Sequence, residues 1–164
     1  MIGRRGVDGV RAADLIASGG IVLRPAYGSF EDTVRGLVDE MIANRCLPSV
    51  LREQATRAVV ERETMQSTAI VEIGVAVPHA RLEGVAGVVA AMAVSPTAVY
   101  YAMAGVPISI VVVVLSAPEL VGDHLDTLAS VSLMLQSADT RRNLEHASDS
   151  VAAERILRGG NGRR

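Results

Sequence analysis

The sequence predicts an α/β fold, a single layered domain with a mixed β-sheet of about five strands flanked by α-helices. With 164 residues, 49% of them hydrophobic and 21% charged, the chain can bury one core and is too apolar to be disordered. Residues 84–118 contain no charged side chain, and their Val- and Ile-rich runs indicate strands buried on both faces. Amphipathic helical patterns precede and follow this segment.

Both ends of the chain are predicted to be flexible. Residues 1–11 are rich in Gly and Arg, and residues 159–164 form a short basic tail. The folded domain is therefore assigned to residues 12–158, and no internal repeat divides it.

Two helices are expected before the apolar centre. Ser29 is a typical N-cap residue, and the apolar side chains after it recur at helical spacing. Pro48 and Ser49 are expected to open a second helix, with Val50 in its apolar stripe. That helix should end near Glu63, because polar and small residues follow.

The apolar centre predicts strands rather than a membrane span. Residues 84–118 are long enough to cross a bilayer, but Pro and Gly interrupt them repeatedly. The longest uninterrupted run, 108–115, has the length of an ordinary strand. We therefore expect buried strands at about 85–94 and 107–117, a shorter one at 21–23, and no direct membrane insertion.

Three helices are expected after the centre. The first begins near His124 and carries Leu125 in its apolar stripe. Asp139 is the expected N-cap of a shorter helix, and Ser150 that of the last helix, which includes Val151.

The composition excludes several functions. All 16 basic residues are arginine, so a Schiff-base lysine and a P-loop lysine are ruled out. The net charge of −2 gives no reason to expect nucleic acid as a partner. Cys46 is the only cysteine and no Cys/His cluster has zinc spacing, so we expect neither metal nor cofactor. The N-terminus lacks the apolar core of a signal peptide, which predicts a cytoplasmic protein.

Residues 74–81 form the most informative stretch. Small apolar residues run into Pro78, which must end or edge a strand because it has no N–H for the ladder. His79 is thus expected at a strand end, partly exposed. From spacing alone it is either an ordinary histidine or a reactive one.

Five motifs occur in a fixed order along the folded domain: Arg62-Glu63, Ser67-Thr68, Gly74-Val75-Ala76-Val77-Pro78-His79, Gly105 with Pro107, and His124-Leu125. This ordered set resembles the fructose/mannitol-type (type 2) enzyme IIA domain of the bacterial phosphoenolpyruvate-dependent sugar phosphotransferase system, a family that includes nitrogen-regulatory proteins.

The resemblance implies that His79 accepts a phosphoryl group from the histidine-containing phosphocarrier protein and passes it to a IIB partner. An imidazole with a pKa of about 6.5 is largely neutral at pH 7, so a ring nitrogen can attack phosphorus. The family uses the ε nitrogen, and the sequence alone does not indicate which nitrogen is available here. If active, the protein is thus a phosphotransferase component.

The same resemblance implies roles around the reactive histidine. Arg62 would stabilise the phosphoryl group, against the alternative of a solvated helix charge. Ser67 and Thr68 would bind its oxygens or simply cap a loop. His124 would orient the phosphohistidine or be an ordinary helix-start residue. Arg81 would contact a partner or the phosphate.

The approach to the motif departs from the family. Ala69 and Val71 stand where glycines are common, and the connection is one residue longer. Glu72 lies in this segment and would repel a phosphoryl group if it pointed at the site.

Three functions follow. In the first, the phosphoryl group moves on to a IIB protein of a sugar-uptake chain. In the second, the protein is a stand-alone nitrogen-type regulator whose phosphorylation state controls its binding to target proteins. In the third, which Glu72 keeps open, it is a scaffold that has lost phosphorylation.

Overall fold

The computed structural model describes residues 4–159, with side chains from Ala12 onward. Its α-helices are α1 (Arg4–Gly19), α2 (Phe30–Ala43), α3 (Arg52–Met65), α4 (Val121–Leu135), α5 (Ala138–Glu145) and α6 (Ser150–Leu157). Short 3₁₀ turns lie at Ser49–Leu51 and Met103–Gly105. The strands are β1 (Ile21–Leu23), β2 (Val75–Ala76), β3 (His79–Arg81), β4 (Val88–Val94), β5 (Tyr100–Tyr101), β6 (Pro107–Ile108) and β7 (Ile110–Ser116).

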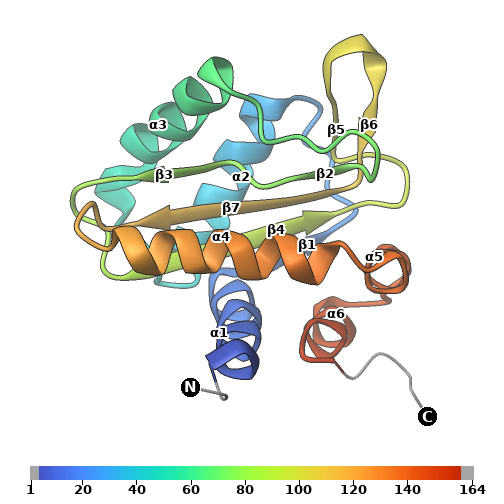
Figure 1. Ribbon diagram of the computed structural model, residues 1–164. Coiled ribbons are helices and arrows are strands. Elements are labelled where there is room, and N and C mark those ends of the chain that lie inside the picture. Colours follow the sequence, from blue (N-terminus) through green and yellow to red (C-terminus); the bar gives the residue numbers. More distant parts are fainter. Residues whose placement is uncertain (1–3, 160–164) are drawn as a thin grey trace.

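A mixed five-stranded sheet forms the centre of the molecule (Figure 1). β1 runs parallel to β4, and β4 runs antiparallel to β7. β2 and β3 both run parallel to β7, one after the other along its length. The prediction of a mixed sheet of about five strands flanked by helices is therefore confirmed. β5 and β6 form a separate hairpin, which the sequence did not predict.

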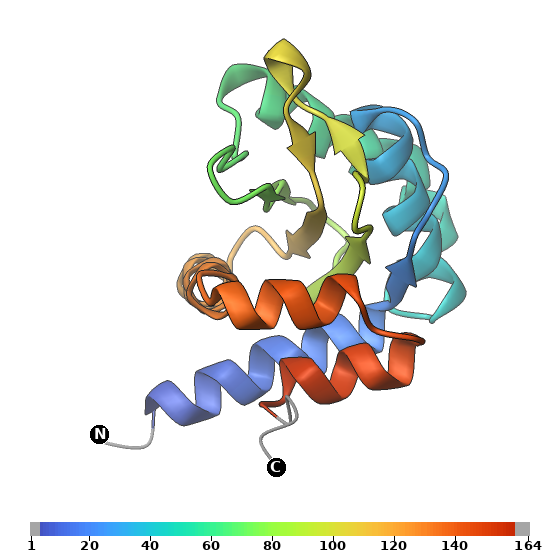
Figure 2. The same cartoon turned by 90° about the vertical axis from the view of Figure 1, so that its right-hand side faces the viewer.

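Helices cover both faces of the sheet, which explains why its central strands are apolar throughout. Figure 2 shows α2 and α3 on one side and α1, α4, α5 and α6 on the other. Successive side chains of a strand point to opposite faces. In β7, Val111, Val113 and Leu115 thus face α2 and α3, whereas Ile110, Val112 and Val114 face the other helices. Among the described residues, no helix combines the length and apolarity needed to cross a membrane.

The element ends differ from the predictions at several points. α1 begins at Arg4, within the segment 1–11 predicted to be flexible, and residues 1–3 lie outside the described part of the chain. Of the predicted tail at 159–164, only Gly159 is described. The strand expected at 85–94 begins at Val88. The strand expected at 107–117 is divided between β6 and β7 at Ser109.

Two predicted helix caps are wrong by one or two residues. The side chain of Ser137 caps α5 by accepting the N–H of Thr140, and Asp139 lies in the first turn, where its carboxylate faces the positive helix end. Asp149 caps α6 in the same way, so Ser150 is the first helical residue. The predicted cap of α2 is confirmed, because Ser29 accepts the N–H of Asp32.

Three side chains predicted to be in apolar core stripes are exposed instead. Val50 is 82% exposed, because it lies in a 3₁₀ turn whose period buries Leu51. Leu125 and Val151 are 58% and 62% exposed on the outer faces of α4 and α6. Leu125 borders the pocket described below.

Candidate functional site

His79 begins β3, directly after the proline that separates two short strands. Pro78 has no N–H for the ladder, but its carbonyl accepts the N–H of Val114 at 3.1 Å. His79 is itself paired with Val114 in the parallel register. The strand thus ends before Pro78 as predicted, but pairing resumes at once. The histidine is therefore held by the sheet.

Two hydrogen bonds determine the tautomer of His79. Its Nδ1 lies 2.8 Å from the carbonyl oxygen of Val77, which can only accept, so Nδ1 carries the proton. Arg62 Nε, which can only donate, lies 3.1 Å from His79 Nε2. Nε2 must therefore present its lone pair. The ring is neutral, and its ε nitrogen is an unprotonated nucleophile once the Arg62 hydrogen bond is released.

The surroundings of His79 favour this neutral form. Burial lowers the pKa of His79 below its usual value, and the Arg62 cation acts in the same direction. The hydrogen bond to the Val77 carbonyl and the negative charge of Glu63 oppose this shift in the pKa of His79 without reversing it. At neutral pH the imidazole is therefore unprotonated at Nε2.

A network of hydrogen bonds runs from Glu63 to the reactive ring. The Glu63 carboxylate accepts the Ser67 hydroxyl at 3.1 Å, the Thr68 N–H at 2.8 Å and the Thr68 hydroxyl at 3.0 Å. Thr68 Oγ1 in turn accepts the N–H of Val77 at 3.1 Å. The peptide carbonyl of Val77 then holds His79 Nδ1. The end of α3 is thereby connected to the orientation of His79.

His124 lies in the first turn of α4 and is only 5% exposed. Its ring lies beside that of His79, with centroids 5.2 Å apart and planes inclined by 59°. Its Nδ1 lies 2.5 Å from the hydroxyl of Ser116, at the end of β7. Burial, reinforced by the nearby His79, Arg81 and Arg62, lowers the pKa of His124 to about 4.

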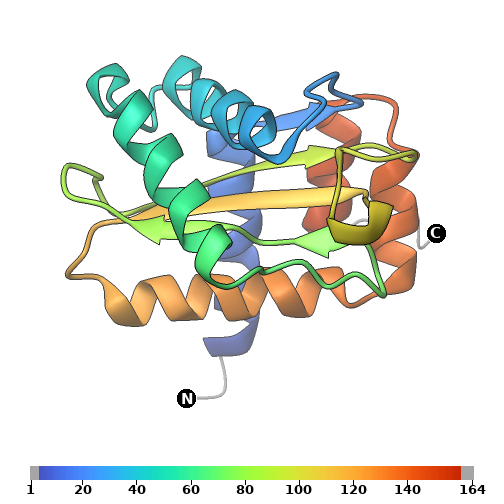
Figure 3. The same ribbon diagram turned by 90° about the horizontal axis from the view of Figure 1, so that it is seen from above.

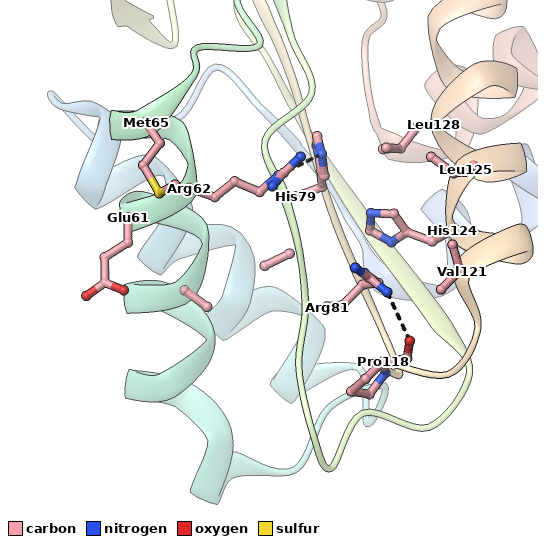
Figure 4. Close-up of a pocket in the computed structure, with 12 residues that line it drawn as sticks. Glu61, Arg62, Met65, His79, Arg81, Pro118, Val121, His124, Leu125 and Leu128 are labelled. Atoms are coloured by element: carbon pink, nitrogen blue, oxygen red, sulfur yellow. Dashed lines mark hydrogen bonds between the residues drawn. The ribbon is translucent and has the colours of Figure 1, made fainter.

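The two histidines line an open pocket of about 570 Å³ between α3, β3 and α4 (Figure 4). Arg62 reaches it from α3 and Arg81 from β3, where Arg81 also donates to the carbonyl of Pro118 at 3.1 Å. Figure 3 shows α3 and α4 on either side of the strand that carries His79. The border of the pocket includes three exposed apolar side chains, Met65, Val121 and Leu125.

The structure brings four of the six predicted site residues together: His79, His124, Arg62 and Arg81. Ser67 and Thr68 do not line the pocket, and both hydroxyls are engaged by Glu63. Their predicted contact with phosphate stays a prediction.

Glu72, the acidic residue in the approach segment, is exposed in the turn between Ile70 and Val75. It does not line the pocket. The acidic side chain that acts on the pKa of His79 is instead Glu63, which raises it.

Two contributors to the site make contacts that the sequence does not indicate. Glu63 belongs to a family motif, but its partners lie four and five residues ahead in a loop whose path cannot be read from spacing. Ser116 ends a continuous apolar run, where a lone hydroxyl resembles an ordinary strand residue. Only the docking of α4 against β7 brings it to His124.

Comparison with protein families assigns the chain to a family. The family model described as "Phosphoenolpyruvate-dependent sugar phosphotransferase system, EIIA 2" matches residues 15–159. The chain therefore belongs to the type 2 enzyme IIA family. It is similar to a nitrogen regulatory protein from Pseudomonas aeruginosa, with 31% identity over 122 residues, which are 72% of this chain and 79% of the relative.

Solved structures share the fold. The nitrogen regulatory protein IIA-Ntr from Neisseria meningitidis superposes with a TM-score of 0.73 and 21% identity, covering 88% of this chain and 97% of its own. The mannitol-specific cryptic enzyme IIA CmtB from Escherichia coli has a TM-score of 0.68 and 17% identity, covering 92% and 99%. The Escherichia coli IIA-Mtl, solved in complex with phosphorylated enzyme IIB-Mtl, has a TM-score of 0.67 and 17% identity, covering 87% and 96%.

Proposed function

We propose that His79 accepts a phosphoryl group from the histidine-containing phosphocarrier protein of the phosphotransferase system. The Nε2 lone pair attacks phosphorus, a new N–P bond forms, and the N–P bond of the donor phosphohistidine breaks. The electron pair of the broken bond returns to the donor ring nitrogen. The observation that carries this proposal is the tautomer of His79, whose Nε2 carries no proton and accepts a hydrogen bond from Arg62.

No base is needed for this step, because Nε2 has no proton to lose. The ring gains positive charge as the bond forms, and the hydrogen bond from Nδ1 to the Val77 carbonyl stabilises that charge. Arg62 Nε donates to the lone pair of the reacting nitrogen at 3.1 Å, so this hydrogen bond breaks before the attack. A small rotation would let its guanidinium donate to phosphoryl oxygens, which together carry about two negative charges.

The border of the pocket supports a protein as the phosphoryl donor and acceptor. Met65 and Leu125 are 84% and 58% exposed, on opposite sides of the pocket. Large exposed apolar side chains around an open site are typical of a docking surface. A structurally similar IIA protein is known in complex with a phosphorylated IIB protein, and we propose a IIB protein as the acceptor here.

A second function is favoured by the similarity to nitrogen regulatory proteins. In this case the phosphoryl group on His79 is not passed to a IIB protein but controls the binding of target proteins. The added negative charge changes the docking surface, so that target proteins bind one state better than the other.

Labelling with phosphoenolpyruvate, enzyme I and the phosphocarrier tests the shared first step. We expect acid-labile, base-stable phosphate on the wild type and on His146→Ala, since His146 is exposed and distant in sequence from the pocket residues. His79→Ala should remain unlabelled. Equal labelling of His79→Ala would refute the assignment, and an unlabelled wild type with active partners would favour a scaffold.

Addition of candidate IIB proteins separates the two functions. Loss of label from His79 with gain of label on a IIB cysteine indicates a carrier. Retention of label, with binding of target proteins that depends on phosphorylation, indicates a regulator.

A further inference from the structure

The hydroxyl of Ser116 and the ring of His124 form a buried hydrogen bond with each other. Ser116 is fully buried at the end of β7, and its backbone carbonyl is already used by the N–H of Leu82. Its hydroxyl lies 2.5 Å from Nδ1 of His124 and has no other hydrogen-bond partner in the described part of the chain. The Ser116 hydroxyl therefore has only His124 Nδ1 as a hydrogen-bond partner in this part of the chain.

Only one arrangement of protons satisfies both groups. If Nδ1 carried the proton of the neutral ring, the Ser116 hydroxyl would accept it and its own hydrogen would point into a dry interior without an acceptor. If the hydroxyl donates, Nδ1 accepts and the ring proton lies on Nε2. The low pKa of His124 fits this arrangement, because at neutral pH the ring carries a single proton.

We propose that Ser116 is a positioning residue that fixes His124 as the Nε2–H tautomer, the opposite of the tautomer in His79. The inference rests on the proposed phosphorylation of His79. In this pair, His79 offers a lone pair to phosphorus while His124 offers an N–H to the phosphoryl oxygens.

The geometry supports a direct role for that N–H. His124 projects from α4 toward His79 on β3, and the ring centroids are 5.2 Å apart (Figure 4). A group added to Nε2 of His79 would enter the pocket that His124 lines. With the other tautomer, Nε2 of His124 would present a lone pair to the negatively charged oxygens, and the contact would be repulsive.

Long-range ¹H–¹⁵N NMR of the histidine rings in the unphosphorylated protein tests the tautomers directly. We expect a protonated Nε2 and an unprotonated Nδ1 for His124, and the reverse for His79. A proton on Nδ1 of His124 would overturn the proposal. This measurement needs no phosphotransfer, so its failure is distinguishable from failure of the proposed function.

Two substitutions of Ser116 test its part in the arrangement. Ser116→Ala should give His124 a mixture of tautomers while His79 keeps its pattern, and should slow phosphorylation of His79 roughly fivefold, the effect of losing one oriented hydrogen bond. Ser116→Thr keeps the hydroxyl and should retain the wild-type ring signals and rate. An unchanged His124 tautomer or an unchanged rate in Ser116→Ala would overturn the positioning role, since a merely structural serine would affect stability alone.

Discussion

Replacing Thr68 with Val removes the centre of the network that connects α3 to the reactive histidine. The Thr68 hydroxyl accepts the N–H of Val77 at 3.1 Å and donates to the Glu63 carboxylate at 3.0 Å. A hydrogen bond to a charged group contributes about 1.5–3 kcal/mol and a neutral one about 1 kcal/mol. Thr68 is only half-buried, which weakens both, so we expect the free energy of unfolding to fall by about 2 kcal/mol.

Urea unfolding followed by circular dichroism measures this change, and Thr68→Ser is the matched control because it keeps the hydroxyl. The serine variant should lose less than about 1 kcal/mol, the cost of one methyl group at a half-buried position. The Val77 carbonyl holds His79 Nδ1, so the valine variant should also accept phosphate about tenfold more slowly. If valine were no more harmful than serine in both assays, the network would have no role in holding the site.

Three further predictions concern charge and packing. His124 is protonated below about pH 6.5 in the unfolded chain, but only near its pKa of about 4 in the folded chain. The free energy of unfolding should therefore fall as the pH drops between these values, by up to about 3 kcal/mol. Urea unfolding at several pH values should show a smaller fall in His124→Gln. Arg62→Ala removes a cation that lowers the pKa of His79, so NMR titration should find a higher pKa of His79, and phosphorylation should slow at least about tenfold. Gly19→Ala would drive a Cβ into a backbone carbonyl of β4 and should destabilise the protein by about 3 kcal/mol in thermal unfolding. Gly122→Ala has open space in α4 and should be neutral or stabilising, and equal losses for both glycines would contradict the packing argument.

The sequence predicted the sheet and its reactive edge because both depend on short-range patterns. Continuous Val and Ile runs indicate strands covered on both faces, and β4 and β7 are such strands. Pro78 cannot donate to a ladder, which predicts a break next to His79, and β2 ends at Ala76 before β3 begins at His79. The family motifs also predict that His124 and Arg62 lie beside His79, and all three line one pocket.

The hydrogen bonds that orient the two histidines depend on side-chain contacts that cannot be predicted from the spacing of residues in the sequence. The sequence assigned Thr68 to phosphate or to loop capping, whereas its hydroxyl connects Glu63 with Val77. Ser116 and His124 are eight residues apart across a turn, and their contact requires the fold. Val50 was misassigned because a 3₁₀ turn changes the helical period before α3 begins.

The β5–β6 hairpin is a suitable place to attach a reporter, because it is far from the histidine pair. It extends at the end of the sheet away from β3 (Figures 1 and 3), and Met103 near its tip is 92% exposed. Ala104 and Gly105 both have left-handed backbone angles, and a Cβ on Gly105 would meet nothing within 4 Å. Exposed tips of this kind accept inserted segments. A reporter placed between these two residues would leave the histidine pair intact and make the docking partners of the pocket accessible to capture and imaging.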